Sequence, residues 1–468
     1  MNLSRLRKLK YALPLAAIVM AFTAVASTAK PTASAAGTPI KIAILSDCKG
    51  AFAAFYGADV GGAIMAFTEL TGAKVVNKND PLKGMTGGTI GGHPIKLVGI
   101  GCSNDSADLA LSETKRLMEK NKADLLIGPL SGDEGVTVAK YAKAHPTKTF
   151  VNGTSGALDT TMIVRAPNFF RWNADGAQWN AGTGWVAYNV LGWRKVNVIE
   201  DDYSFGWTSA AGFIAEFCAL GGQVTKRVLP PLNTTDYSSY VAQLDPPNQT
   251  DGYFWTVGGT GTLGALKAFE QKFGQINAKQ HMGNLFWDTA GTFADLGLRI
   301  AGAYAGSGGT VADIPSAAFT KFQGTIAKTW NALPPLKGKA TVTGPGNVFF
   351  VNYYNNAKAL ILGLKKVKGD ISGGQKALQK AMAKISVVDP NGYRLKLDNN
   401  RQAIGDTFVA QLIDNGGTLG VKSVYKVVNV PQTFGGAFSP TSPPPSGTSP
   451  ACKKSADGTI PWKVTKLS

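Results

Sequence analysis

Two successive series of strand and helix patterns occur in the same order along the chain, and this duplication limits its possible folds most strongly. The first series has apolar strand runs at 39–47, 93–100 and 123–128, separated by helical patterns at 61–70 and 109–120. The second has strand runs at 195–202, 223–230 and 252–257, separated by helical patterns at 209–220 and 237–244. Each series has the order of a βαβαβ half, and its apolar strands favour a parallel sheet covered on both faces. The sequence therefore predicts an α/β protein with two Rossmann-like lobes.

A Gly-containing turn follows the last strand of each series and leads into a helix. The two segments are ADLLIGPLSGDEG at 123–135 and TDGYFWTVGGTGTLG at 250–264. The first amides of a helix have no intrahelical partners, so each turn offers hydrogen-bond donors and a partial positive charge to an anion. Because parallel sheets bind ligands beyond the carboxyl ends of their strands, the two turns predict a two-sided binding cleft.

The first 35 residues have the pattern of a secretory signal peptide. Four cations between residues 5 and 10 precede an apolar stretch at 12–26, which is followed by small residues. This stretch is short for a membrane span, and an uncleaved anchor remains the alternative. The cleavage region has no Cys to carry a lipid. We therefore expect an exported protein that loses its signal peptide and is not a lipoprotein.

Positive charge exceeds negative charge, with a formal net charge of +18. The lysines are scattered, and the sequence has no arginine-rich stripe or known nucleic-acid-binding module. We interpret the excess as a solvated basic surface and expect no nucleic-acid partner.

Four cysteines in an exported chain favour disulfides over metal ligation. Cys48 follows the first strand and Cys102 follows the second, so adjacent parallel strands would bring them within bridging distance. A disulfide between these two is expected. For Cys218 and Cys452 the sequence leaves two possibilities open, a second disulfide or two free thiols.

Motifs for catalysis are missing from the sequence. It has three histidines, no Gly-x-Ser-x-Gly elbow after a strand, and no HExxH, CxxC or Walker-type loop. We therefore expect no catalytic residues, no metal site and no cofactor. The neighbouring Asp201 and Asp202 at the end of a strand are expected to be solvated, because adjacent strand residues point to opposite faces.

Several strings, in this order along the chain, resemble the type I periplasmic binding proteins of the leucine/isoleucine/valine-binding group, the receptors of ABC importers. They include IKIAIL, LIGPLSG, FVNGTSGAL, VNVIEDDYSFG and YYNNAKAL. The resemblance covers about 38–430 and implies that three hinge crossovers join the lobes, near 166–172, 301–309 and 387–393. Lobe one would comprise 38–168 with 305–388, and lobe two 169–304 with 389–430. A Pro/Ser/Gly-rich tail, 431–468, follows, and its segment 439–450 is expected to be flexible or poorly ordered.

The resemblance also implies how a ligand is held between the lobes. Amides and hydroxyls of two lobe-one turns would bind its carboxylate, and an acidic residue of lobe two would bind an amino group. The matching positions are Ser131, Gly132, Thr154 and Ser155 for the carboxylate, Asp288 for the amino group, and Tyr56, Tyr203 and Phe205 as aromatic walls. Gly259 departs from the family, whose members often have a polar or aromatic side chain there, and implies a backbone contact or a roomier pocket. Ser131 and Thr154 would otherwise cap helices, Asp288 could cap the helix after it, and the aromatic residues could pack in the core.

Together these features predict an exported receptor that captures an amino acid or related small carboxylate and delivers it to a membrane permease. A ligand-sensing receptor on the same scaffold, signalling to a membrane partner, is the alternative. A hydrolase with an unrecognised site is a third hypothesis.

Overall fold

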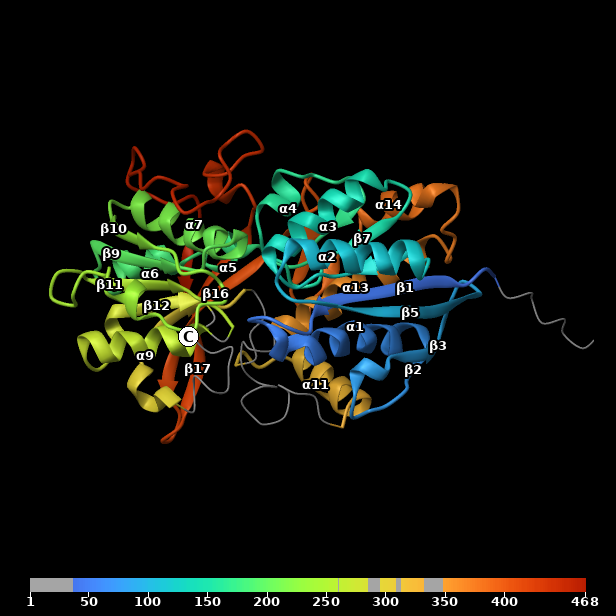
Figure 1. Ribbon diagram of the computed structural model, residues 1–468, viewed down its shortest axis with the longest axis horizontal. Helices are drawn as coiled ribbons and strands as arrows, with labels where there is room; N and C mark the ends of the chain where they lie inside the picture. The colour runs from blue at the N-terminus through green and yellow to red at the C-terminus, as the bar shows by residue number, and fades with distance from the viewer. Residues whose placement is uncertain (1–36, 260, 285–294, 309–312, 332–347) are drawn as a thin grey trace, which may run out of the picture. The chain divides into compact units, whose positions relative to one another are not determined.

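The computed structural model describes residues 37–259, 261–284, 295–308, 313–331 and 348–468 (Figure 1). The predicted signal peptide and Asp288 lie outside the described residues. Within the described part of the chain, no helix has both the length and the apolar character needed to cross a membrane. Two large β-sheets, each built mainly from one of the predicted series, organise the described chain.

The first sheet has six strands in the order β4-β5-β1-β6-β7-β8. Neighbours are parallel except β4, which pairs antiparallel with β5. The strands are β1 (Ile40–Asp47), β4 (Thr89–Ile90), β5 (His93–Ser103), β6 (Leu125–Ile127), β7 (Thr149–Val151) and β8 (Phe169–Phe170), with a small β2 (Ala73–Val75) and β3 (Met85–Gly87) pair nearby. The associated helices are α1 (Tyr56–Thr71), α2 (Ala107–Lys115), α3 (Gly132–Ala144), α4 (Asp159–Met162), α11 (Ala317–Thr329), α13 (Val348–Lys366) and α14 (Lys376–Met382).

Strand β1 shows how this sheet is covered on both faces (Figure 1). Ile42 and Ile44 pack with α1 and α13, whereas Ala43 and Leu45 pack with α3 on the other face. All four side chains are fully buried. Successive strand residues point to opposite faces, so the run of residues between two covered faces is apolar on both sides, as the sequence predicts.

The second sheet has the strand order β10-β9-β11-β12-β13-β16-β15-β14, with β17 paired to β16 and β18 to β17. Its strands are β9 (Lys195–Glu200), β10 (Gln223–Val228), β11 (Gly252–Thr256), β12 (His281–Asn284), β13 (Tyr304–Gly306), β14 (Val387–Val388), β15 (Arg394–Leu397), β16 (Ala403–Asp414), β17 (Leu419–Val430) and β18 (Val464–Lys466). Its helices are α5 (Gly176–Trp179), α6 (Thr183–Asn189), α7 (Ser204–Ala219), α8 (Ser238–Val241) and α9 (Gly261–Phe273).

Strand β11 alternates in the same way as β1. Tyr253 and Trp255 pack with α8 and α9, and Phe254 packs with α6 and α7. The buried Trp255 indole donates a hydrogen bond to His281 Nδ1 at 3.0 Å, so its one polar atom is satisfied inside the core.

Three segments cross between the two sheets, as the resemblance implies. The first follows β8, and the second follows β13, which pairs with β12 before the chain reaches α11 in the first core. The third runs through the β14–β15 hairpin, whose Val387 and Leu395 contact the first core, into β16 of the second sheet. Since β13 still belongs to the second sheet, the return to lobe one begins after Gly306 rather than at residue 305.

The C-terminal tail is attached to the second lobe on both sides of segment 439–450, the part expected to be flexible. Cys452 forms a disulfide with Cys218 of α7, and β18 pairs antiparallel with β17. The Trp462 indole donates to Glu216 Oε1 at 2.9 Å, and Phe434 is buried against α4 and α7. A Pro/Ser/Gly-rich composition predicts a chain without its own core, but here a covalent cross-link and aromatic anchors attach the segment to the domain.

Candidate functional site

A small pocket lies at the carboxyl ends of strands from both sheets and holds about 260 Å³ of empty space. Three loops of lobe one contribute to it, after β1, β6 and β7, together with the start of α13. The other wall comes from α5 and from the start of α7. Its lining residues are Phe52, Leu130, Ser131, Gly132, Thr154, Gly156, Trp179, Tyr203, Phe205 and Phe349. Of the nine predicted ligand-binding residues, five line this pocket: Ser131, Gly132, Thr154, Tyr203 and Phe205.

Ser131 is the most informative polar residue in the pocket. It precedes the first residue of α3, but its side chain makes no capping hydrogen bond to that helix. The residue is 1% exposed and its hydroxyl has no hydrogen-bond partner. A buried hydroxyl without a partner costs free energy, which a ligand acceptor would recover. The hydroxyl and the first amides of α3 therefore form a set of donors suited to an anionic group.

The turn after β7 contributes Thr154 but not Ser155. Both amides donate to the carbonyl of Pro129, at 3.1 and 3.3 Å, so neither is free for a ligand. The Ser155 hydroxyl lies against Gly135 of α3, beneath the turn, and does not line the pocket. The Thr154 hydroxyl makes one long hydrogen bond, 3.4 Å to the Phe349 carbonyl. The sequence could not distinguish Thr154 from Ser155. Only the folded turn shows that Ser155 faces α3 and that Thr154 faces the pocket.

Aromatic rings form most of the pocket wall. Trp179 and Phe205 meet edge to face with ring centroids 5.3 Å apart, and Phe52 lies 6.4 Å from both Tyr203 and Phe349. The Trp179 indole N–H is buried without a partner. Phe52, Trp179 and Phe349 were not expected from the sequence. The first is the only one with a usable signal, since it belongs to the loop after the first predicted strand.

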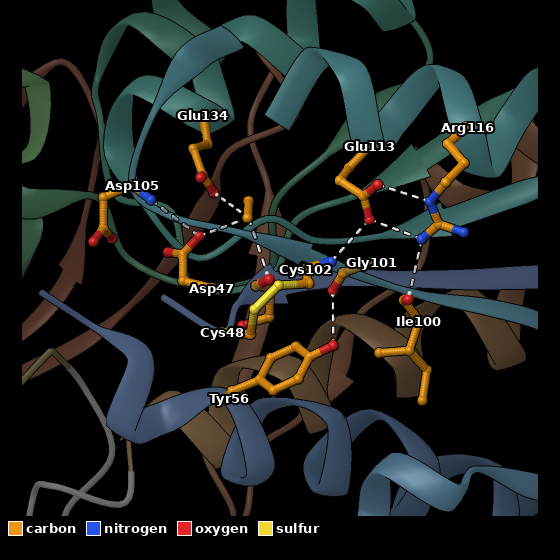
Figure 2. Close-up of a disulfide and its surroundings, with 12 residues drawn as sticks. Asp47, Cys48, Tyr56, Ile100, Gly101, Cys102, Asp105, Glu113, Arg116 and Glu134 are labelled. Carbon is orange, nitrogen blue, oxygen red and sulfur yellow. Dashed lines mark hydrogen bonds and ion pairs between the residues drawn. A yellow bond between two sulfur atoms is a disulfide. The ribbon is translucent and has the colours of Figure 1, made fainter. Parts of the chain in front are cut away.

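Tyr56 lies elsewhere. Its hydroxyl donates to the Gly101 carbonyl at 3.1 Å, and its ring packs against the first core beside the Cys48–Cys102 disulfide (Figure 2). It begins α1, and the helix directs its side chain toward β5 rather than toward the second lobe. Phe52, four residues earlier, supplies the lobe-one aromatic wall instead.

The two lobes touch at the pocket. The amide of Ser204, at the start of α7, donates to Asp133 Oδ1 of α3 at 3.1 Å. An added Cβ at Gly132 would lie 2.7 Å from Ser204 Oγ and 2.8 Å from the Phe205 amide nitrogen. Asp133 also places a carboxylate at a helix N-terminus, where negative charge is favoured. The structure thus brings the lobes into direct contact around the pocket.

The turn after β11 makes a different contact from the one expected. Gly259 has a φ of +57° and lies against the Ala51 carbonyl of lobe one, so it joins the lobes without lining the pocket. Asp201, expected to be solvated, is fully buried and accepts a hydrogen bond from the Gly258 amide at 2.8 Å. Burial raises its pKa well above the ordinary value. The turn needs an internal acceptor, and the buried strand end supplies one.

The loop that carries Phe52 is attached to the end of β5 in three ways. Cys48 is disulfide-bonded to Cys102, with their Cα atoms 5.1 Å apart. The amides of Cys48 and Lys49 both donate to the Ser103 carbonyl, at 3.1 and 3.2 Å. The disulfide and the two hydrogen bonds therefore fix the loop that forms one wall of the pocket. In Figure 2, Asp105 lies on the far side of Asp47 from this disulfide, at the edge of a group of buried carboxyls.

Asp47, Asp105 and Glu134 form that group of carboxyls beside the disulfide (Figure 2). The Ser103 hydroxyl lies 2.6 Å from Asp47 Oδ1 and 3.1 Å from Glu134 Oε2. Burial, with the Asp47 carboxylate nearby, raises the pKa of Asp105 to about 8 and that of Glu134 well above its ordinary value. Within the described part of the chain, no group of three or more His, Cys, Asp or Glu side chains is arranged to hold a metal ion.

The raised pKa of Asp105 predicts that the free energy of unfolding falls as pH rises. The ordinary pKa of the Asp105 carboxyl is 3.8, whereas in the folded protein it is about 8. Between these values the folded state binds more protons, so the free energy of unfolding decreases with increasing pH. We expect a higher melting temperature at about pH 5 than at about pH 8, and a smaller difference in Asp105→Asn, which cannot ionise. Calorimetry at both pH values measures this.

Asp236→Asn is the control, because it removes a carboxylate that is fully exposed. This variant is expected to keep the wild-type difference between the two pH values. A difference in Asp105→Asn as large as in the wild type would contradict the assignment.

Comparison with known proteins places the chain in a family. Residues 39–418 match the family model described as periplasmic binding protein. None of the curated proteins compared matches the chain. Residues 419–468, which include β17 and the tail, lie outside the match.

Solved structures of solute-binding proteins have the same fold. An R. palustris ABC transporter solute-binding protein in complex with benzoate is 22% identical, with a TM-score of 0.66 over 82% of this chain and 96% of its own. Another from R. palustris, with 4-hydroxybenzoate, is 19% identical, with a TM-score of 0.68 over 84% and 98%. A leucine-binding protein from Thermotoga maritima is 19% identical, with a TM-score of 0.63 over 82% and 97%. With two α/β lobes, three crossovers and a pocket between the lobes, the chain belongs to the periplasmic binding protein family.

Proposed function

We propose that this protein is the exported solute-binding receptor of an ABC importer and captures a small carboxylate between its lobes. The observation that carries the proposal is the unpartnered, buried hydroxyl of Ser131 at the N-terminus of α3. Such a donor set binds an anion without burying a lysine or arginine. Release to a membrane permease follows from the receptor role, and the predicted signal peptide supports a site of action outside the cytoplasmic membrane.

An aromatic carboxylate fits the pocket best. Five of its lining residues are aromatic, and none of the lining residues is an acid or a base. The pocket is small and walled largely by aromatic rings, which suits a compact, flat molecule. The benzoate complexes of structurally similar proteins support this choice.

An amino acid is the second candidate ligand, favoured by the resemblance and by the fold shared with a leucine-binding protein. It requires an acceptor for the ammonium group, and Asp288 is the residue proposed for that role. A sensing receptor that signals to a membrane partner remains the alternative function. Adjacent genes for two permeases and two ATPases would support transport over sensing.

Isothermal titration calorimetry of the mature protein tests the ligand class. We expect one-to-one binding of benzoate or 4-hydroxybenzoate, and no binding of benzyl alcohol, which has the ring without the carboxylate. Ser131→Ala is expected to weaken benzoate binding by roughly 1.5 to 3 kcal/mol, the range for a hydrogen bond to a charged group.

Two other results would change the proposal. Binding of leucine but not benzoate, weakened in Asp288→Asn, would replace the aromatic acid with an amino acid. If neither benzoate nor 4-hydroxybenzoate nor any amino acid binds, the proposal that the ligand is a small carboxylate is rejected.

A further inference from the structure

The turn at 153–157 presents Thr154 and Gly156 to the pocket, and each of its five carbonyls accepts a hydrogen bond from elsewhere. The donors come from the end of β7, the first crossover and α13. They are Asn356 Nδ2 to Gly153 at 3.0 Å, Asn173 Nδ2 to Thr154 at 3.2 Å, Asn152 Nδ2 and Arg171 Nη1 to Ser155 at 2.8 and 3.2 Å, the Gly176 amide to Gly156 at 2.8 Å, and Arg171 Nη1 to Ala157 at 2.7 Å. A turn with every carbonyl bound has little freedom to rearrange.

Arg171 donates to two of these carbonyls and also contacts groups outside the turn. It is fully buried in the first crossover, and besides the two carbonyls it donates through Nη2 to the Thr161 hydroxyl at 2.9 Å. Its Nε donates to Gln402 Oε1 of the third crossover. Asp175, also fully buried, lies 3.7 Å from Nη2 and provides the opposite charge. Burial lowers the pKa of Arg171 to about 10, so the guanidinium stays charged at neutral pH.

The same network continues into the third crossover and the tail. Gln402 Nε2 donates to the Asn173 carbonyl at 2.7 Å and to Gln178 Oε1 at 2.8 Å. Gln432, at the start of the tail, donates to the Thr161 hydroxyl at 2.6 Å and to Asp175 at 3.2 Å. Two crossovers and the tail therefore meet at one buried guanidinium.

We propose that Arg171 is a positioning residue for ligand binding, which holds the 153–157 turn in its binding geometry and ties it to the crossovers. This inference rests on the proposed function only for the choice of ligand in the binding experiment. The planar guanidinium can serve two carbonyls, a hydroxyl and an amide oxygen at once, whereas a lysine ammonium is a compact charge with three donors. A side chain needed only for charge balance with Asp175 would be replaceable by lysine.

The test compares Arg171→Lys with a matched arginine that also binds a main-chain carbonyl. Arg116 donates to the Ile100 carbonyl at 3.2 Å and pairs with Glu113 (Figure 2). It does not line the pocket. Benzoate affinity is measured by calorimetry well below the melting temperature of each variant, where all are folded. Arg171→Lys is expected to bind roughly tenfold or more weakly, and Arg116→Lys within about twofold of the wild type. Unchanged affinity in Arg171→Lys would overturn the proposal.

Thr161→Val serves if Arg171→Lys does not fold, because it removes one acceptor of the guanidinium without changing charge or size greatly. We expect benzoate binding weakened by roughly threefold or more. Wild-type affinity in this variant would count against a positioning role.

Hydrogen exchange gives a readout that needs no ligand. The Thr154 and Ser155 amides donate to Pro129, so their exchange reports on the turn, and amides of β6 report on the surrounding sheet. In the variants, exchange at the turn is expected to accelerate more than exchange in β6. Equal acceleration at both places would indicate general destabilisation and reject the inference. If the wild type binds no carboxylate, the proposed function fails, and the exchange result still decides the role of Arg171.

Discussion

Gly132→Val is expected to weaken ligand binding by roughly fivefold to 150-fold, equivalent to about 1 to 3 kcal/mol of overpacking. Gly132 begins α3 and faces α7 of the other lobe, where even a Cβ would approach Ser204 Oγ and the Phe205 amide nitrogen within 2.8 Å. The branched side chain of valine would keep α3 and α7 from approaching as closely as they do in the structure. Calorimetry with benzoate measures the loss.

A second glycine provides the control for this experiment. Gly324 lies within α11, and an added Cβ there meets nothing within 4 Å. Gly324→Ala should therefore keep wild-type affinity, with a small gain in stability from the higher helix propensity of alanine. Equal affinity in Gly132→Val and the wild type would show that contact between the lobes at α3 and α7 is not needed for binding.

Removing the Cys218–Cys452 disulfide by a double substitution to serine is expected to lower the free energy of unfolding by about 5 kcal/mol. The bond closes a loop with a sequence separation of 234 residues, and cross-linking distant residues lowers the entropy of the unfolded chain. Equilibrium unfolding in guanidinium chloride measures the change. Limited proteolysis is expected to cleave the tail first, near residue 452, because that segment loses its covalent attachment to α7.

The double substitution of Cys48 and Cys102 provides the comparison. Its sequence separation is 54 residues, and we expect a smaller loss of roughly 2 to 4 kcal/mol. A larger loss for this pair than for Cys218 and Cys452 would contradict the loop-length argument. It would indicate that the tail contributes little to the stability of the domain.

The order of the strands and helices could be predicted because their signals are local. Apolar runs such as 39–47 and 252–257 are β1 and β11 in the structure, and the helices expected at 61–70 and 209–220 lie within α1 and α7. The hairpin-forming strand after residue 418 is missing from the two-series pattern. Asn415, Gly416 and Gly417 indicate a chain reversal, but only the pairing of β17 with β16 shows that the strand continues for twelve residues.

The pocket could be predicted only where one loop determines it. Ser131 and Gly132 follow from the strand, turn and helix pattern of 123–135, since the N-terminus of a helix after a parallel strand points to the ligand side. The partners of these residues come from distant segments. Trp179 and Phe349 reach the pocket through the packing of α5 and α13, and no spacing in the sequence relates these two positions.

Burial decided what the remaining polar residues do. Asp201 and Asp202 are neighbours at one strand end, yet only Asp201 is enclosed, because the turn at Gly258 folds over it. Arg171 is one of many cations in the sequence until the crossovers converge on it.

The sequence by itself determined the α/β class, the duplicated halves and the turn that places Ser131 at the start of a helix, because periodicity and turn chemistry act over a few residues. Tertiary structure alone decided which side chains face the pocket, how the tail is attached and which charges are buried. Those outcomes depend on contacts between residues hundreds of positions apart, such as Cys218 with Cys452 and Arg171 with Gln402. These contacts contribute to stability only after the distant segments that form them have packed together.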